Sequence, residues 1–338
     1  LGILLGTSVG LQLVAIIWTW NVTGTLDFTE GGILEGKVSA AVISILLFLY
    51  MYGIGKAALM PIHRWLPAAM VAPTPVSALL HAVAVVKAGV FTVLKVIIYI
   101  FGVDTLAGIS EDNWLMYIAA FTLIASSCVA LTKDNLKARL AYSTISQLAY
   151  IVLGAALANG LGIMGGSMHI AMHAFGKITL FFCAGAIMVA SHKTEISEMD
   201  GLGKVMPITF IAFLIGSLSV IGLPPLGGSW SKWYLMLSSA EAGYTIFLIV
   251  FMVSSLLNIA YLMPIVARGF FSSPKPTKNS HNDHSENVGF WHSLQIGTIK
   301  EAPPFCLLAM TLSSLGCIVL FIYADYIYQL LAPIAGLK

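Results

Sequence analysis

Long apolar runs alternate with short polar connections along almost the whole chain. Runs of about 20 apolar residues recur, which is the length that an α-helix needs to cross a hydrocarbon core of roughly 30 Å. Turn-forming residues such as Asn21 with Gly24 and Asn159 with Gly160 separate the runs. The pattern predicts an all-α polytopic membrane protein with nine transmembrane helices, at residues 1–20, 38–60, 75–101, 114–132, 138–158, 163–190, 206–237, 243–271 and 303–323.

Composition supports the same class. The chain is 58% hydrophobic and 9% charged, with a mean hydropathy of +0.91, whereas soluble domains have about 25% charged residues. We therefore expect a single transmembrane domain over residues 1–338 that is surrounded by the lipid bilayer, and nothing in the sequence indicates a nucleic-acid partner.

Basic residues are distributed unevenly between the two sets of connections. The connections after the first, third, fifth and seventh helices hold only Lys37. The alternate connections hold ten: Arg64, Lys133, Lys137, Arg139, Lys193, Lys204, Arg268, Lys275, Lys278 and Lys300. Since basic connections stay on the cytoplasmic side, we expect Leu1 inside and Lys338 outside. Leu1 begins within an apolar run without a basic leader, so we do not expect a signal peptide, and the missing initiator methionine indicates further helices upstream.

Four lysines lie inside the apolar runs, whereas all 15 aspartates and glutamates fall in the connections or beyond the last run. A lysine at membrane depth costs several kcal/mol unless it faces a partner or a wet cavity, so each is a functional candidate. These residues are Lys56, Lys87, Lys177 and Lys232. Together they indicate charge movement through the membrane, and the lack of acidic partners indicates that part of the machinery lies outside this chain.

Lys56 lies in the run YMYGIGKAALMPIHRWLP. Gly53 and Gly55 weaken the helix before it, and Pro61 removes a backbone hydrogen bond after it. Such weakening is tolerated at membrane depth only beside protein or water. The alternative is a lysine that snorkels to the nearby cytoplasmic surface, since only about 7.5 Å of helix rise separates it from Pro61.

The third helix, PTPVSALLHAVAVVKAGVFTVLK, carries His81 and Lys87 six residues apart. That spacing is roughly 240° around an ideal helix, so the two share a face only if the helix is locally widened, as in a π-bulge. Both lie well inside the run, which makes snorkelling a poor explanation for Lys87. Lys95, nearer the outer end, is interpreted as an interfacial anchor.

The sixth helix presents His169, His173 and Lys177 at i, i+4 and i+8, stacked along one face about 6 Å apart per step. Histidine titrates near neutrality, and burial brings lysine toward the same range. The spacing therefore predicts a proton relay. The alternative is a zinc site, but no third acidic or thiolate ligand lies in register, and we expect no metal.

Lys232 lies in SVIGLPPLGGSWSKWYLM, where Pro224-Pro225 and Gly227-Gly228 predict a broken helix between Ile221 and Trp230. Interrupted helices are how transporters build ion sites. Whether Trp230 and Trp233 line that site or anchor an interface stays open.

The remaining motif-like residues are interpreted as structural. Cys128, Cys183, Cys306 and Cys317 lie in apolar runs without metal-ligand spacing. Residues 272–302 are expected to form a mobile loop, with its histidines, His281, His284 and His292, as solvated residues and not metal ligands.

Four segments carry a family resemblance: KAALMPIHRWLPAAMVAPTPVSALLHAVAVVKAGVF, LKARLAYSTISQLAYI, MHIAMHAFGKITLFFCAGAI and GLPPLGGSWSKWYL. They resemble signature segments of the antiporter-like proton-pumping membrane subunits. That family includes membrane-arm subunits of respiratory complex I, membrane-bound hydrogenases and the multisubunit Mrp sodium/proton antiporters. The resemblance covers roughly residues 38–271 in unbroken order.

The resemblance implies a fourteen-helix fold with two inverted five-helix repeats and broken helices. This chain would supply the end of the first repeat (1–101), the second repeat (114–271), the loop and a final span with its tail (303–338). Lys56 would match the pump lysine that pairs with a glutamate two spans earlier, upstream of Leu1, and Lys87 the bridge between channels. His169, His173 and Lys177 would match the connecting polar axis, and Lys232 the terminal lysine.

The amino-acid sequence of the second and third helices is most similar to that of the D-type proteins of Mrp sodium/proton antiporters. We therefore expect proton or cation/proton translocation, with other integral membrane subunits as partners, H⁺ and Na⁺ as ions, and a bacterial inner membrane as location. The alternatives are a proton-pumping subunit of a complex I-type or hydrogenase assembly, and a structural subunit that transports nothing. The chain has no nucleotide loop, Fe–S cysteine pattern or flavin motif, so we expect no cofactor and no redox chemistry of its own.

Overall fold

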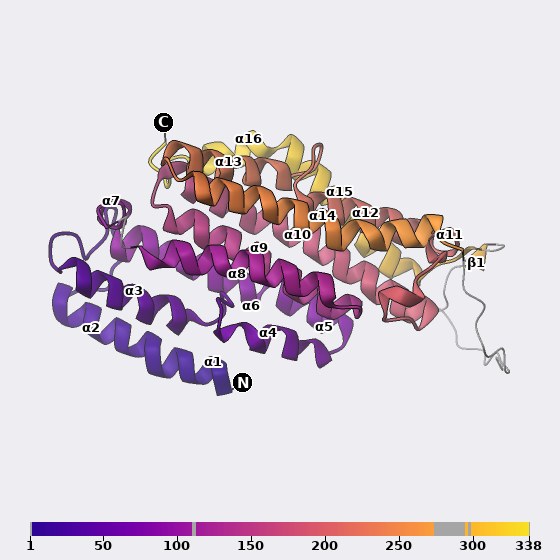
Figure 1. Cartoon of the computed structure of the whole chain (residues 1–338), viewed down its shortest axis with the longest axis horizontal. Coiled ribbons are helices and arrows are strands. Elements are labelled where there is room, and N and C mark those ends of the chain that lie inside the picture. The colour runs from indigo at the N-terminus through magenta and orange to yellow at the C-terminus, as the bar shows by residue number, and fades with distance from the viewer. Residues whose placement is uncertain (1, 110–112, 274–294, 297–298, 338) are drawn as a thin grey trace.

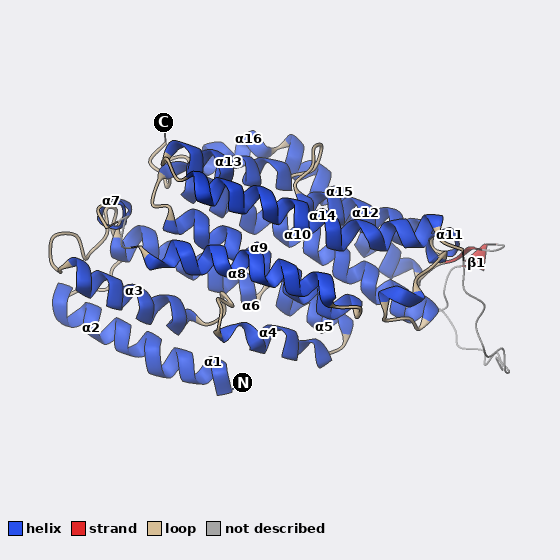
Figure 2. Cartoon of the chain, in the orientation of Figure 1, coloured by secondary structure: helices blue, strands red, loops and turns tan. Residues whose placement is uncertain are grey.

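The computed structural model describes residues 2–109, 113–273, 295–296 and 299–337. Long helices lie side by side in one elongated bundle (Figures 1 and 2), which confirms the all-α membrane class. Most of the expected loop 272–302, including His281, His284 and His292, lies outside the described residues.

The first half of the chain forms α1, η1 and α2 as one continuous helix, then α3, a series of short turns, a long composite helix and α8. Their bounds are α1 Gly2–Leu5, η1 Gly6–Gln12, α2 Leu13–Thr23, α3 Ala40–Ile54, η2 Ile62–Arg64, α4 Trp65–Ala68, η3 Ala69–Val71, α5 Thr74–Ala78, η4 Leu79–Val83, α6 Val85–Lys95, η5 Val96–Phe101, α7 Val103–Ala107 and α8 Trp114–Thr132.

The second half contains the longest helices and a two-residue hairpin. Its elements are α9 Leu136–Ala156, α10 Gly160–Ser191, η7 Ile196–Glu198, α11 Leu202–Val205, α12 Pro207–Ile221, α13 Gly228–Glu241, α14 Thr245–Phe271, β1 Gln295–Ile296, β2 Ile299–Lys300, α15 Pro304–Ile322 and α16 Ala324–Leu331. The short helix α16 follows directly on α15, past the expected end of the last span at residue 323.

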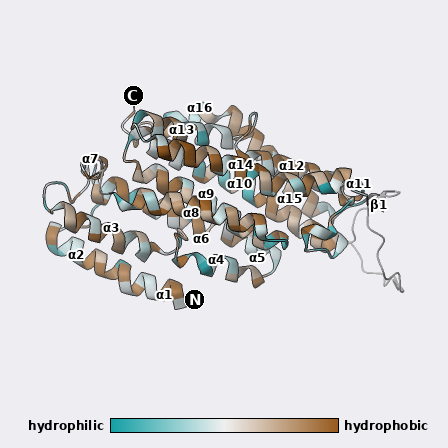
Figure 3. Ribbon diagram, in the orientation of Figure 1, coloured by the Kyte–Doolittle hydropathy of each residue, from teal (hydrophilic) through white to brown (hydrophobic). Residues whose placement is uncertain are grey.

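Among the described residues, five helices are long and apolar enough to cross a membrane by themselves: Gly2–Thr23, Trp114–Thr132, Gly160–Ser191, Thr245–Phe271 and Pro304–Ile322. Hydrophobic positions follow the helices along their length (Figure 3). Two shorter apolar helices, α3 and α12, are each followed by a break. The count of nine spans stays a prediction.

Asparagine begins three of the long helices. The side-chain oxygens of Asn113, Asn135 and Asn159 accept hydrogen bonds from backbone N–H groups in the first turns of α8, α9 and α10. These bonds satisfy donors that the helix itself leaves unpaired. This explains why a polar residue directly precedes each of these three apolar runs.

The predicted break in the seventh span is confirmed. Helix α12 ends at Ile221 and α13 begins at Gly228. Gly222 has φ +91°, and a Cβ on Gly228 would lie 1.9 Å from the carbonyl oxygen of Ser219. Glycine is therefore required at both points, at the first for its backbone conformation and at the second for the close approach of the chain.

A second break corrects our expectation for the second span. We expected a helix to residue 60, but α3 ends at Ile54 and Lys56 lies in an unwound segment. The backbone there leaves the helical conformation, with φ +52° at Gly55 and φ +55° at Ala58. Freed carbonyl groups accept side-chain donors, with Trp65 Nε1 3.1 Å from the Gly55 oxygen, as a membrane interior requires.

Polar residues separate two hydrophobic cores along the same helices. In α9 the buried apolar side chains up to Ala141 belong to one core and those from Ile145 onward to the other. Helices α10 and α14 change cores in the same way, after Met172 and Phe251. Buried polar residues lie at or directly beside each of these changes: Ser143, Thr144, Ser146, Gln147, His173, Lys177, Ser254 and Asn258. A polar layer therefore crosses the interior of the bundle.

Candidate functional site

Lys87 and His173 make the central contact of this layer. The Nζ of Lys87, on α6, hydrogen-bonds Nδ1 of His173, on α10. The two side chains are only 6% and 2% exposed. Among the described residues Nε2 of His173 is buried with no hydrogen-bond partner.

His169 continues the site one helical turn earlier on α10. Its ring stacks on that of His173, with centroids 5.6 Å apart and planes at 11°. Nδ1 lies 2.8 Å from the hydroxyl of Ser231 on α13, and Nε2 lies 3.1 Å from Oε1 of Gln147 on α9. Both ring nitrogens therefore have partners, and the partners come from different helices.

Lys177 lies one turn beyond His173 and is fully buried. Its ammonium donates to Ser143 Oγ at 2.6 Å and to the carbonyl oxygen of Leu140 at 3.3 Å. Both acceptors belong to α9, and both are uncharged. The three residues of the predicted relay are thus buried inside the bundle and do not face lipid.

Lys232 reaches back to the break that precedes its own helix. Its Nζ donates to the carbonyl oxygen of Ile221 at 3.0 Å, a group left free because α12 ends there. The ammonium also lies 4.5 Å from the centre of the Tyr150 ring, within range of a cation–π interaction. Ser255 Oγ is a longer contact, at 3.5 Å.

Asn258 on α14 joins the lysines, and the sequence did not predict it. With its amide oxygen toward Lys232, that oxygen accepts from Lys232 Nζ at 2.8 Å and from Gln147 Nε2 at 2.9 Å. Tyr261, one turn later, lies 2.5 Å from the same amide and 2.7 Å from Ser143 Oγ. A chain of hydrogen bonds therefore runs from Lys232 to Lys177.

These additional polar residues carry a signal in the sequence. Ser143, Gln147 and Tyr150 follow the 4–3 spacing of one helix face, and Ser254, Asn258 and Tyr261 do the same in the next-to-last long run. Uncharged polar residues at that spacing in an apolar run indicate a buried polar face. The positions of the lysines and histidines alone do not reveal this face.

Lys56 is exposed, in contrast with the buried lysines. It lines a small cavity of about 80 Å³ together with Gln12, Gly89 and Thr92. Gly89 lies two residues after Lys87, and a Cβ there would come within 2.6 Å of the Lys56 carbonyl carbon. The backbone of Lys56 therefore touches the helix that carries Lys87, although its side chain is outside the buried cluster.

His81 lies in the π-helical turn η4, Leu79–Val83. This turn is the local widening that a shared face with Lys87 requires, but the side chain of His81 is outside the described part of the structure. Lys95, the last residue of α6, holds its ammonium 3.9 Å from the centre of the Phe28 ring.

Two other expectations concern residues near the site. Trp230 and Trp233 are 38% and 56% exposed, so both lie on the surface of the bundle. In the described part of the chain, no group of three or more His, Cys, Asp or Glu side chains comes together to hold a metal ion.

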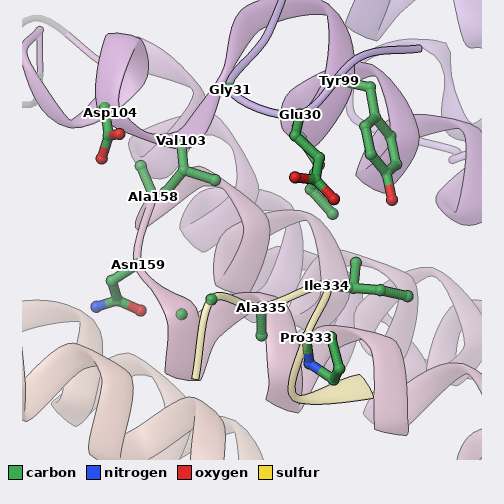
Figure 4. A pocket seen from close by; sticks show the side chains of 13 residues that line it. Glu30, Gly31, Tyr99, Val103, Asp104, Ala158, Asn159, Pro333, Ile334 and Ala335 are labelled. Atoms are coloured by element: carbon green, nitrogen blue, oxygen red, sulfur yellow. The ribbon is translucent and has the colours of Figure 1, made fainter. Parts of the chain in front are cut away.

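A cavity of about 600 Å³ lies at the end of the bundle where the connection between α9 and α10 meets the C-terminal segment. Glu30, Tyr99, Asp104 and Asn159 line it, together with the C-terminal segment around Pro333 (Figure 4). None of the buried lysines or histidines lines it.

Comparison with known proteins places the chain in a family. The family described as "NADH:quinone oxidoreductase/Mrp antiporter, TM" matches residues 2–258. NAD(P)H-quinone oxidoreductase chain 5 of Synechocystis sp. is 40% identical over 65% of this chain and 34% of its own length. NADH-quinone oxidoreductase subunit N of Desulforudis audaxviator is 32% identical over 81% of this chain and 55% of its own.

Among solved structures, a chain of the Mrp complex from Dietzia sp. DQ12-45-1b shares the fold, with a TM-score of 0.80 and 21% identity over 98% of this chain and 66% of that one. This chain thus spans about a third to about two thirds of the lengths of these proteins. The resemblance found in the sequence is confirmed. The chain is a multi-pass integral membrane protein, and it belongs to the NADH:quinone oxidoreductase/Mrp antiporter transmembrane family.

Proposed function

We propose that this chain moves protons across a bacterial inner membrane through its buried polar layer. The observation that carries the proposal is the set of five buried ionisable side chains, Lys87, His169, His173, Lys177 and Lys232. Within the described chain they hydrogen-bond to carbonyl groups, hydroxyls, amides and one another, without a carboxylate. Three ammonium groups so placed repel one another and are poorly solvated, so the layer favours proton exchange over fixed charge.

The path we propose follows the contacts. Lys87 passes a proton to His173, whose ring stacks on that of His169. Lys177 hydrogen-bonds Ser143 of α9, and Lys232 hydrogen-bonds Asn258 of α14. Lys56 is proposed to act at the start of the path, since its backbone packs against α6 beside Lys87. His81 is proposed to act with Lys87, from the π-helical turn before it.

We further propose that the chain works as a subunit of a multisubunit sodium/proton antiporter, with other membrane subunits as partners. The supporting observations are the His-x5-Lys pair of the third span and the fold shared with the Mrp complex chain. The second candidate is a proton-pumping subunit of a complex I-type assembly, favoured by the 40% identity to NAD(P)H-quinone oxidoreductase chain 5. Copurified Fe–S and flavin subunits would select the second candidate.

Removal of single ammonium groups tests the proposal. Lys87→Ala and Lys232→Ala are expected to abolish proton-coupled transport in membrane vesicles, reported by a pH-sensitive dye, while native gels show an assembled complex. Normal transport in both variants would exclude this path.

A further inference from the structure

The unwound segment between α12 and α13 reaches the surface of the bundle. Leu223 is 41% exposed, and Pro224 and Pro225 are exposed as well. On its other side the segment rests on α15, where the Gly227 N–H donates to the carbonyl oxygen of Cys317 at 3.0 Å. One side of the break is therefore held by the bundle, whereas the other side is open.

The break lies at hydrocarbon depth. Helix α12 before it has 15 residues and α13 after it has 14, which corresponds to about 22 Å and about 21 Å of helix. Neither half alone crosses a core of roughly 30 Å, so the break between them falls inside that core. On the bundle side Gly227 lies against Met172, near the middle of the 32-residue helix α10.

Three backbone carbonyl groups of the break are unpaired among the described residues. They belong to Gly222, Pro224 and Pro225, and neither backbone N–H groups nor side chains of the described chain donate to them. Irregular backbone that faces lipid does not occur within the hydrocarbon core, because each unpaired polar group there is strongly unfavourable. Lipid alone therefore does not cover this side of the break.

A cavity of about 300 Å³ opens at the same place. Its walls are mostly apolar, and they include Gly222, Pro224, Trp230, Trp233 and Phe321, which we call the break surface. The indole N–H groups of its two tryptophans have no acceptor in the part of the chain that the structure describes. The break surface thus combines apolar walls with unpaired donors and acceptors.

We propose that a transmembrane helix of a neighbouring subunit covers the break surface. Exposed aromatic side chains are enriched at the centres of protein interfaces, and polar side chains hydrogen-bond between helices in lipid. The partner helix places an apolar side chain in the cavity and a hydroxyl or carboxamide side chain against the unpaired groups, since both of these donate and accept. The inference rests on the proposed function only in that it takes the chain to work beside other membrane subunits.

The cover also concerns Lys232, whose side chain lies behind the break surface. A Cβ on Gly222 would come within 2.7 Å of Lys232 Cδ, so the stem of the lysine packs against this wall of the cavity. A partner helix seated there keeps lipid and bulk water away from that wall. It thereby holds the break in the conformation in which the Ile221 carbonyl accepts from the Lys232 ammonium.

Photocrosslinking in native membranes, with the full-length subunit in its complex, tests the contact. Trp233→p-benzoylphenylalanine keeps an aromatic side chain at a position that is 56% exposed. We expect ultraviolet light to join it to another membrane polypeptide of the purified complex. Mass spectrometry should place the crosslink in an apolar span, with a serine, threonine, asparagine or glutamine within about one helical turn of it.

Leu256→p-benzoylphenylalanine is the matched control. Leu256 is 65% exposed, and it lies inside α14, which is one helix of 27 residues. It has the depth of Lys232, since the hydroxyl of the neighbouring Ser255 is 3.5 Å from Lys232 Nζ. The backbone around Leu256 is paired within its helix, so we expect adducts with lipid and none with a partner.

The strength of the contact is a second measurement. Trp233→Ala removes a ring that is more exposed than buried, so it leaves the packing of the chain intact. We expect the amount of partner retained on native gels to fall by about tenfold or more, as for a tryptophan at the centre of an interface. Leu256→Ala should retain the partner as the unaltered protein does.

The other outcomes overturn the inference. Crosslinks from Trp233→p-benzoylphenylalanine to lipid alone, to another segment of the same subunit or to a second copy of it would identify a different cover. A crosslinked span without a hydrogen-bonding side chain, or equal capture of one polypeptide from both positions, would also contradict it. The proposed function fails separately: if Lys232→Ala leaves transport intact, the proton path is excluded while the crosslink from position 233 stands.

Discussion

The Nζ of Lys232 lies 3.0 Å from the carbonyl oxygen of Ile221, the last residue of α12. Eleven residues separate the two in sequence, and only the break in the helix brings them together. The carbonyl groups at the end of a helix carry partial negative charge, so the break supplies an acceptor to the ammonium in a region without a carboxylate. The broken helix and the buried lysine are therefore parts of one structure.

Gly222→Ala tests this relationship. A Cβ at residue 222 would lie 2.7 Å from Cδ of Lys232 and would be held at φ +91°, a strain of roughly 1–2 kcal/mol for a residue with a side chain. We expect transport to fall by about tenfold or more, because the lysine stem is displaced from Ile221. Gly243→Ala is the control, with φ +74° and no atom within 4 Å of the added carbon. Equal effects in both variants would assign the loss to backbone strain alone.

The sequence predicted the helices well, and one of the two breaks accurately, because each depends on local chemistry. Apolar runs of sufficient length form helices in lipid, and the two prolines and two glycines after Ile221 cannot continue one. The earlier break was not predicted, because the sequence indicated only a weakened helix that continues to residue 60. Gly53 and Gly55 are compatible with a helix, and what ends α3 at Ile54 is a set of partners from elsewhere, such as Trp65 and Thr122.

The candidate site was predicted only as far as charge reveals it. Lysines and histidines in apolar runs are easy to identify as candidates, because placing an ionisable side chain at membrane depth costs free energy. Asn258 and Gln147 are not, since an uncharged amide in a long helix often points to a neighbouring backbone group. Their role depends on the packing of α9 and α14 against Lys232. The spacing of polar residues within either helix does not predict that packing.

A second prediction compares two lysines of α6. Lys87→Met removes the ammonium that contacts His173 and keeps the length of the side chain, and we expect proton transport to be lost with assembly intact. Lys95→Met is the matched control at the C-terminal end of the same helix, where the ammonium lies over the Phe28 ring. It should keep at least half of the transport rate, since an exposed cation–π pair contributes only about 0.5–1 kcal/mol. Similar losses in the two variants would argue against a special role for Lys87.

A third prediction concerns the partner of Lys177. Ser143→Ala removes an acceptor 2.6 Å from the ammonium and also the hydroxyl that hydrogen-bonds the hydroxyl of Tyr261. Lys177 then keeps only the Leu140 carbonyl, and a lost hydrogen bond to a charged group costs about 1.5–3 kcal/mol. We expect transport to fall by roughly ten- to a hundredfold, in line with that energy.

Ser126→Ala serves as the control for Ser143→Ala. Its hydroxyl is also buried, but it bonds only carbonyl groups of its own helix, those of Thr122 and Leu123. Transport by this variant should match that of the unaltered protein. A fall in both serine variants, accompanied by weaker assembly on native gels, would show a general packing defect.

The last prediction concerns Glu301, a fully buried carboxylate that the sequence placed in a polar connection. Its Oε1 accepts from the backbone N–H groups of Ile208 at 2.7 Å and Thr209 at 3.3 Å, and its Oε2 accepts from the Thr209 hydroxyl at 2.6 Å. Glu301 thus satisfies unpaired donors in the first turn of α12, where a negative charge is also favoured. Glu301→Ala leaves these donors buried without an acceptor, at about 1–3 kcal/mol for each.

We therefore expect Glu301→Ala to lower the melting temperature of the complex, and Glu301→Gln, which keeps an acceptor oxygen, to lower it less. Glu241→Ala, at the exposed end of α13, should leave it unchanged. Below the melting transition, the alkaline limb of the plot of proton-transport rate against pH should stay at the same pH in all three variants. Glu301 binds the start of α12, whereas Lys232 contacts its end. A shifted limb in Glu301→Gln would contradict this separation and would place the carboxylate within the proton path.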